Sequence, residues 1–348
     1  MDLHITDWES TNNHMKRISL LFVCVAFLLS ACGQPAPLPT STPQPPTLTP
    51  TATFTATATL PPTLTPTATQ NPDPATWTKE EVRANHELER LAYIEEQGPA
   101  ASIPALEYHG DNYRIPFGAA VVELSPEKFE EQMAWFHENR VHAVTGEELR
   151  DWLNGSIELP ARSVILTFDL GNNGVNSVPR MLEVFRKYQM FGLFTITHYG
   201  MEPGSSNLCP DDRCWEAFRT AHNSGYVTIG THTISHADFS LKTREDGLAE
   251  LTESKRIIEE KIGNGCDVFL LTWPLEAVPA WAKELKTIGI EIAFGGNTYP
   301  ILQNAAWKDK PEDWFKLPRI LPPNSNGISG RPGGKTLEEI MKMYTASW

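Results

Sequence analysis

The chain has 348 residues and a formal net charge of −14, with 28 Pro, 23 Gly and 5 Cys. This length allows one large domain or two medium ones. The acidic balance, with no Lys/Arg run longer than two residues, argues against a nucleic-acid partner, which a basic surface would attract. An acidic, solvated surface is the simpler interpretation.

The first 31 residues are predicted to be an export signal. A Lys-Arg pair precedes an apolar run at 18–30, which is shorter than the roughly 20 residues of a membrane span. The run ends in Leu-Ser-Ala-Cys-Gly, which resembles a bacterial lipobox with Cys32 as the lipidated residue. An ordinary signal peptide with an incidental cysteine is the alternative. Residues 1–14 are acidic and fit no signal peptide, which favours Met15 as the true start.

A Pro/Thr-rich segment follows the signal. Residues 34–78 hold 12 Pro and 15 Thr, and their only ionisable side chain is Asp73. This composition cannot bury enough apolar surface to offset the entropy of ordering, so residues 32–78 are predicted to be a disordered tether, either plain or carrying O-glycans on its threonines. Together with a lipidated cysteine, it predicts an exported protein anchored in the membrane at the cell surface. The folded domain is expected at 79–348, which is long enough for a full core.

Cysteine use agrees with export. Cys209 and Cys214 flank a Pro-Asp turn, and outside the cytosol such a pair is interpreted as a small-loop disulfide. A zinc knuckle would need two more ligands nearby, and the neighbouring sequence has none. Cys266 is expected to be a buried free thiol.

Helices and strands alternate through the predicted domain. In chain order we expect a helix at 79–97, a strand at 103–109, helices at 125–139 and 145–155, a strand at 163–168, a helix at 177–189, a strand at 192–197, a helix at 211–224, a strand at 226–230, a helix at 243–262, a strand at 267–272, a helix at 278–288, a strand at 290–294 and a helix at 336–344. The helices at 125–139 and 145–155 open with a Ser or Thr N-cap and the capping-box pattern. Alternation implies parallel strands with crossover helices, so the fold is α/β, either a barrel or a doubly wound sheet.

Four titratable side chains stand at or just after predicted strand ends, where chemistry collects in such folds. His109 ends one strand, Asp169 follows another, and His232 and His236 follow a third. If the chain turns helically there, the two imidazoles lie on one face and could bind one metal. The pattern is not that of a zincin, because Thr233 stands where HExxH has glutamate. Each of these signals is weak alone.

Taken together, the segments resemble the polysaccharide deacetylase family (NodB-homology domain, carbohydrate esterase family 4). The resemblance runs from about Ile103 to Arg319 and is closest to the branch that deacetylates poly-N-acetylglucosamine, in which the Tyr-His segment comes first. The pieces that agree in order and spacing include Ala105-Leu106-Glu107-Tyr108-His109, Val164-Ile165-Leu166-Thr167-Phe168-Asp169, His232-Thr233-Ile234-Ser235-His236, Trp273-Pro274 and Leu317-Pro318-Arg319-Ile320.

The resemblance implies a distorted (β/α) barrel of the NodB-homology type that hydrolyses the acetamide of an amino-sugar polysaccharide. It implies that Asp169 is the base that deprotonates water and that His109 is the acid that protonates the leaving amine. It also implies that His232 and His236 bind a divalent metal, with Zn, Co or Ni expected. The substrate-binding segment would be Trp273, Pro274 and Leu275, with a backbone N–H near the last facing the oxyanion.

The sequence departs from the family pattern at two places. After Trp273-Pro274 it continues as Leu275-Glu276, where the family usually has an aromatic residue and Gly. The family's third metal ligand is an aspartate, and here the position holds Leu170, which cannot coordinate a cation. Three explanations stay open. Asp169 coordinates the metal while also serving as base, or a neighbour substitutes, or the domain is a catalytically inactive glycan-binding lipoprotein on the same fold. The neighbours considered are Asn172, Asn173, Asn176 and His198.

Overall fold

The structure is a computed structural model that describes residues 76–117, 120–171, 176–198, 213–263, 265–272, 278–295, 301–302, 311–323 and 335–345. The predicted signal, Cys32 and nearly all of the tether lie outside these residues. The chain divides into two units, and all the described residues belong to the second, Thr67–Trp348. In this described part of the chain, no helix combines the length and the apolar character needed to cross a membrane.

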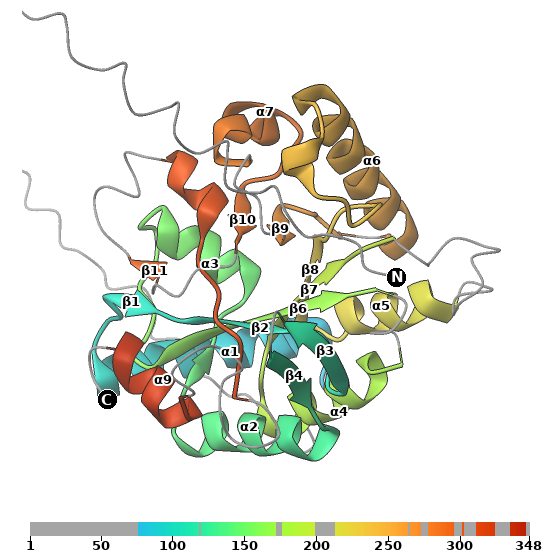
Figure 1. Ribbon diagram of the computed structural model, residues 1–348. Coiled ribbons are helices and arrows are strands. Elements are labelled where there is room, and N and C mark those ends of the chain that lie inside the picture. Colours follow the sequence, from blue (N-terminus) through green and yellow to red (C-terminus); the bar gives the residue numbers. More distant parts are fainter. Residues whose placement is uncertain are drawn as a thin grey trace, which may run out of the picture. The chain divides into compact units, whose positions relative to one another are not determined.

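A curled parallel sheet occupies the middle of this unit (Figure 1). Its strands follow the order β10-β9-β8-β7-β6-β2, and the short β5 pairs with β6. All neighbouring pairs in it are parallel. The strands are β2 (Ala105–Tyr108), β5 (His142–Ala143), β6 (Ser163–Leu170), β7 (Gly192–Ile196), β8 (Val227–Thr231), β9 (Leu270–Thr272) and β10 (Ile292–Phe294).

A short segment near the C-terminus links the two edges of the sheet. Leu317 bridges to Phe294 at the β10 edge, and Ile320 bridges to Leu106 at the β2 edge, both in the parallel sense. The predicted distorted (β/α) barrel is therefore confirmed. Closure also has a consequence for chemistry, because it places Arg319 between two bridging residues, with its side chain buried.

Helices lie around the sheet (Figure 1). Thr78, Thr145 and Thr336 each begin a helix with a complete capping box, since a glutamate follows three residues on. At the start of the helix Pro126–Glu138, Ser125 accepts the N–H of Lys128, but the third helical residue is this lysine rather than a glutamate, so the box predicted there is incomplete. The helices are α1 (Lys79–Gln97), α2 (Pro126–Glu138), α3 (Gly146–Leu153), α4 (Val178–Tyr188), α5 (Arg213–Asn223), α6 (Arg244–Ile262), α7 (Ala282–Thr287) and α9 (Leu337–Tyr344), with 3-10 turns η2 (Phe239–Leu241), η3 (Val278–Trp281) and η4 (Pro311–Lys316).

Most predicted elements are present with shifted ends, and several parts differ. An antiparallel hairpin of β3 (Tyr113–Phe117) and β4 (Ala120–Leu124) was not predicted. Neither was the antiparallel pair of β1 (Ser102–Ile103) with β11 (Ile301–Leu302). The helix predicted at 278–288 is a 3-10 turn followed by the short α7. The β1–β11 pair joins segments that are far apart in the sequence, whereas the β3–β4 hairpin joins neighbouring segments.

Alternation along β6 separates two layers of side chains. Its even-numbered residues from 164 to 170 belong to an apolar core that also contains residues of α2 and α4. Ile165 faces the other way, into a second apolar cluster. Further along the same inward face, Thr167 and Asp169 are buried polar residues. The interior of the barrel therefore changes from apolar to polar toward the carboxyl end of the strand.

Candidate active site

Asp169 is the charged centre at the carboxyl end of the sheet. Its side chain is 4% exposed. The Oδ1 atom accepts hydrogen bonds from Arg319 Nη1 at 2.7 Å, Thr272 Oγ1 at 2.7 Å and Thr195 Oγ1 at 3.1 Å. None of the described residues donates to Oδ2. Because three donors hold one oxygen, the other is the one left for water or a cation.

The pKa of Asp169 is held well below its ordinary value. Burial opposes ionisation, but the charge of Arg319 and the imidazoles of His232 and His109 outweigh it. Arg319 is 2% exposed, and its Nη2 atom lies 3.8 Å from Glu107 Oε1. Asp169 is therefore ionised at ordinary pH. It is paired with the buried guanidinium of Arg319, which also lies near Glu107.

His232 reaches the site from the residue after β8. Its backbone N–H donates to the Ile196 carbonyl at 2.8 Å, which extends the pairing of β7 and β8 by one residue. Its Nδ1 contacts the Thr272 carbonyl, and because a carbonyl only accepts, Nδ1 must carry the proton. The lone pair is then on Nε2, the nitrogen that can ligate a metal. Burial lowers the pKa of His232 to about 4, so the ring is neutral at ordinary pH.

His236 is brought beside His232 by a loop. The two ring centres are 5.0 Å apart and the ring planes are inclined by 64°. Thr233 and His236 adopt left-handed backbone, with φ of 69° and 56°. Each such residue with a side chain costs on the order of 1–2 kcal/mol. The helical turn considered from the sequence is therefore wrong, although the imidazoles meet as it required.

The separation of the two imidazoles is compatible with one shared divalent cation. Rings that share an ion at about 2.1 Å, with a tetrahedral angle between them, have centres roughly 5 Å apart. The observed separation of His232 and His236 agrees with this value, at 5.0 Å. Neutral imidazoles are also the form that binds metals. These two residues would therefore hold the metal that the family resemblance implies.

Position 170 contributes no ligand. Leu170 is fully buried in the apolar core, on the face of β6 opposite to Asp169. The alternation of a strand thus directs side chain 170 away from the site. Of the neighbours considered as substitutes, His198 is buried and its Nε2 lies 3.1 Å from Ser254 Oγ, whereas Asn176 is exposed. The other two, Asn172 and Asn173, lie outside the described residues.

His109 lies at the end of β2, beside Glu107. Its Nε2 atom is 4.0 Å from Glu107 Oε1, and its side chain is 27% exposed. One ligand-type atom each of Glu107, His109 and Asp169 lies within 4.8 Å of the others. Arg319 already contacts both carboxylates, at 3.8 Å and 2.7 Å. The positive charge beside Glu107 and Asp169 is therefore the guanidinium of Arg319. The ring of His109 stays accessible.

The four residues singled out from the sequence therefore gather at one end of the sheet. Asp169 lies close to His109 and His232, and His236 stacks edge-on against His232. Cys32, Cys209 and the segment Trp273-Pro274-Leu275 lie outside the described residues. Cys214 is disulfide-bonded, while Cys266 is a free thiol of intermediate rather than complete burial.

Comparisons with known proteins show what this chain resembles. The sequence profile of the polysaccharide deacetylase family matches residues 156–293. Residues 156–293 therefore match the polysaccharide deacetylase family. A Bacillus subtilis (strain 168) protein, YxkH, whose name places it with the polysaccharide deacetylases, is 26% identical over 174 residues, which cover 48% of this chain and 55% of that protein. The chain thus spans little more than half the length of this relative.

A solved deacetylase structure shares the fold. The Streptococcus pyogenes deacetylase PplD, solved in complex with acetate, is 18% identical, with a TM-score of 0.51 over 64% of this chain and 92% of that chain. IcaB from Ammonifex degensii is 23% identical, with a TM-score of 0.48 over 65% of this chain and 92% of its own. At this level of identity, the likeness to PplD establishes the architecture of the deacetylase domain and nothing finer.

Sequence reasoning missed several residues of the deacetylase site. Glu107 stands two positions before His109, and residues two apart in a strand share a face, so it could have been found. Arg319 was noticed only as part of the resemblance. Thr195 and Thr272 left no signal, because threonine is common in strands. Their contacts with Asp169 exist only through strand register and barrel closure.

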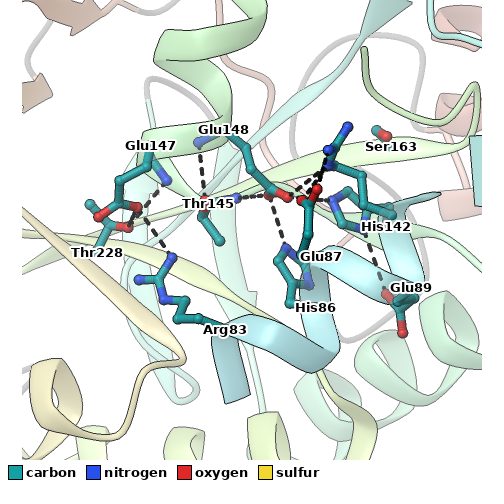
Figure 2. A network of polar contacts seen from close by, with 12 residues as sticks. Arg83, His86, Glu87, Glu89, His142, Thr145, Glu147, Glu148, Ser163 and Thr228 are labelled. Atoms are coloured by element: carbon teal, nitrogen blue, oxygen red, sulfur yellow. Dashed lines mark hydrogen bonds and ion pairs between the residues drawn. The ribbon is translucent and has the colours of Figure 1, made fainter. Parts of the chain in front are cut away.

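A second histidine–carboxylate cluster, drawn in Figure 2, lies at the opposite end of the strands. Glu148 Oε2 is 2.9 Å from His86 Nε2, and Glu148 Oε1 is 3.2 Å from His142 Nε2. The Thr145 N–H also donates to Glu148, at 2.9 Å. Because His142 pairs with the first residue of β6, this cluster lies at the amino-terminal end of the sheet.

The geometry of this second cluster does not fit a metal ion. The rings of His86 and His142 are stacked, with centres 4.3 Å apart and planes inclined by 11°. The lone pair of an imidazole nitrogen lies in the ring plane, so two nearly parallel rings cannot both aim at an ion between them. Arg90 Nε also lies 3.7 Å from Glu148 Oε1, a positive charge where a cation would stand. The cluster is a hydrogen-bonded charge network.

Proposed function

We propose that the chain is a metal-dependent hydrolase that removes N-acetyl groups from an amino-sugar polysaccharide. The observation that carries this proposal is the meeting of a buried carboxylate, Asp169, with three imidazoles at the carboxyl ends of a deacetylase barrel. The family and the deacetylase neighbours support the reaction class. The position of Tyr108-His109 ahead of the other site segments favours poly-N-acetylglucosamine as the substrate class.

Asp169 accepts the proton of the attacking water. Its Oδ1 is held by three donors, so the proton goes to Oδ2. A carboxylate with so low a pKa is a weak base, and it needs a water that is more acidic than bulk water. A divalent cation on His232 and His236 supplies that acidity when bound and polarises the acetyl carbonyl.

His109 protonates the amine that leaves. An amide nitrogen leaves readily only when it gains a proton as the carbon–nitrogen bond breaks. The 27% exposure of the His109 side chain leaves its ring accessible to a polymeric substrate. Water adds its oxygen to the acetyl carbon, the sugar nitrogen departs as an amine, and acetate is released.

Acetate release from N-acetylglucosamine oligomers tests this function. The chain loaded with Zn, Co or Ni should release acetate, and Asp169→Asn and His109→Gln should each reduce kcat about 10²- to 10⁴-fold. Asp151→Asn is the matched control, since Asp151 is an exposed carboxylate on α3 that lies outside the site, with its side chain 44% exposed. No acetate from any oligomer with any of the three metals would refute hydrolysis.

We also propose that the domain is exported and held at the cell surface by a lipid on Cys32. The support comes from the basic and apolar signal, the lipobox and the Pro/Thr-rich residues 34–78. A disulfide-bonded Cys214 is consistent with an oxidising compartment. Cys32→Ser should move the protein from the membrane fraction to the soluble fraction. A variant that stays with the membrane would contradict lipid anchoring.

A further inference from the structure

The loop that carries both imidazoles is held by a carboxylate from another element. Glu250 on α6 accepts three hydrogen bonds at Oε1, from the Ile234 N–H at 3.1 Å, the Ser235 N–H at 2.8 Å and the Ser235 hydroxyl at 2.9 Å. Lys242 Nζ lies 2.9 Å from Oε2, and the Glu250 side chain is 9% exposed. The carboxylate is therefore both shielded and satisfied on its two oxygens.

These bonds act on a strained segment. Ile234 and Ser235 lie between Thr233 and His236, the two residues with left-handed backbone. The loop also holds itself, because the His236 N–H donates to Thr233 Oγ1 at 3.0 Å. Strained residues with side chains persist only where surrounding contacts fix them. Glu250 supplies such contacts from a helix outside the loop.

We propose that Glu250 is a positioning residue for the cation site, holding the loop in the shape that sets His236 beside His232. This inference rests on the proposed function, because that function requires His232 and His236 to bind a cation. Without the carboxylate, two consecutive backbone N–H groups lose their acceptor. The loop can then relax toward right-handed backbone, and His236 moves away from its partner. Glu250 itself touches neither imidazole among the contacts of the described residues.

The chain offers a matched control one turn further along the same helix. Glu253 pairs with Arg256, at 2.8 Å, and its contacts among the described residues do not include the loop. Glu253→Ala therefore removes the same charge from the same helix without touching residues 232–236. Glu250→Gln keeps the shape of the side chain and one acceptor oxygen, and serves if Glu250→Ala fails to fold.

Hydrogen exchange of the metal-free full-length chain tests directly whether Glu250 holds the loop. Mass spectrometry of a peptide covering the loop should show faster exchange in Glu250→Ala than in the parent chain, because the Ile234 and Ser235 amides lose their acceptor. Glu253→Ala should exchange as the parent does. Unchanged protection of the loop in Glu250→Ala would overturn the inference.

Cobalt binding tests whether Glu250 positions the two imidazoles for a metal ion. Partners that orient metal ligands are typically worth about 10- to 100-fold in affinity, so Glu250→Ala should bind Co²⁺ that much more weakly, with an altered visible spectrum. Glu250→Gln should lie between, and Glu253→Ala should match the parent chain. Equal affinity in Glu250→Ala and the parent would refute the positioning role.

The two proposals can fail separately. A parent chain that binds no Co²⁺, or a His236→Ala variant that binds it as well as the parent, would refute the metal site of the proposed function. In that case slower amide exchange of the loop in the parent than in Glu250→Ala would still establish that Glu250 holds the loop. Normal Co²⁺ binding with no effect of Glu250→Ala would leave the proposed function intact and remove only the positioning role.

Discussion

The two ends of the barrel carry similar sets of residues. They differ in how many of their polar atoms are already bonded and in how exposed their histidines are. At the amino-terminal end, Glu148 is surrounded by two imidazoles, a backbone N–H and Arg90, and both histidines are nearly inaccessible, His86 at 4% and His142 at 0% exposure. At the carboxyl end, the donors to Asp169 converge on one oxygen, and His109 is partly exposed.

This comparison shows that residue types do not identify a site. Each cluster combines imidazoles, carboxylates and a buried arginine, and each contains a group whose spacing would admit a metal. Only the carboxyl end combines a held carboxylate, Asp169, with an oxygen that accepts no hydrogen bond from the described residues and with accessible imidazoles. Barrel enzymes place their chemistry at this end. The amino-terminal cluster instead ties α1 to β5 and α3 and is expected to serve stability.

The largest expected effect that separates the two ends comes from Glu148→Ala. It leaves His142 and Arg90 without their buried anion, and breaking a buried pair in this way costs about 3–5 kcal/mol. Urea unfolding of the full-length chain should show a loss of this size. Acetate release per folded molecule should not change.

Glu138→Ala provides the comparison for that measurement. Glu138 is exposed on α2, so its removal should change the free energy of unfolding by less than about 0.5 kcal/mol. If Glu148→Ala lowered acetate release by more than the unfolded fraction explains, the two clusters would not be independent.

The next effect is a pH dependence of stability that arises at the amino-terminal end. Burial opposes protonation of His142, but Glu148 and Glu89 outweigh it and raise the pKa of His142 from 6.5 to about 9. A raised pKa stabilises the fold fully below 6.5, and this contribution is lost as the pH rises through about 9. A shift of this size corresponds to roughly 3 kcal/mol. His86 acts in the opposite sense, because burial lowers its pKa and protonating it at acid pH costs stability.

Urea unfolding at pH 7 and pH 10 measures this contribution. The parent chain should lose roughly 3 kcal/mol more over this interval than His142→Gln, in which the titrating group is gone. His137→Gln removes an exposed histidine from α2 and should follow the parent chain. The same pH dependence in the parent and in His142→Gln would contradict the assignment to His142.

The smallest effect is expected from Thr195→Val at the carboxyl end. It removes one of three donors to Asp169 Oδ1, at 3.1 Å, while Arg319 and Thr272 remain. One hydrogen bond is worth about 1 kcal/mol, so kcat for acetate release should fall by no more than roughly fivefold. Thr252→Val, on an exposed part of α6, is the control. A loss as large as that of Asp169→Asn would mean that Thr195 takes part in the chemistry itself.

Much of the fold follows from local pattern. The helix predicted at 79–97 coincides with α1, and its limits are set by Thr78 and Gly98, whose roles depend on neighbouring residues alone. The β3–β4 hairpin was missed because its stability comes from pairing across strands. The resemblance likewise named Asp169, His109, and the histidine pair, but it did not show that position 170 faces the apolar core.

The sequence by itself determined the alternation of strands and helices, the family that residues 156–293 match and the residue types gathered at the site, because these depend on periodicity and short motifs. Only the tertiary structure decided which side chains share a site. Barrel closure by residues 317–320 brings Arg319 to Asp169, register brings Thr272 to His232, and a left-handed loop aligns His236. The contact of Arg319 with Asp169 joins residues 150 positions apart in the chain, and no local pattern encodes it.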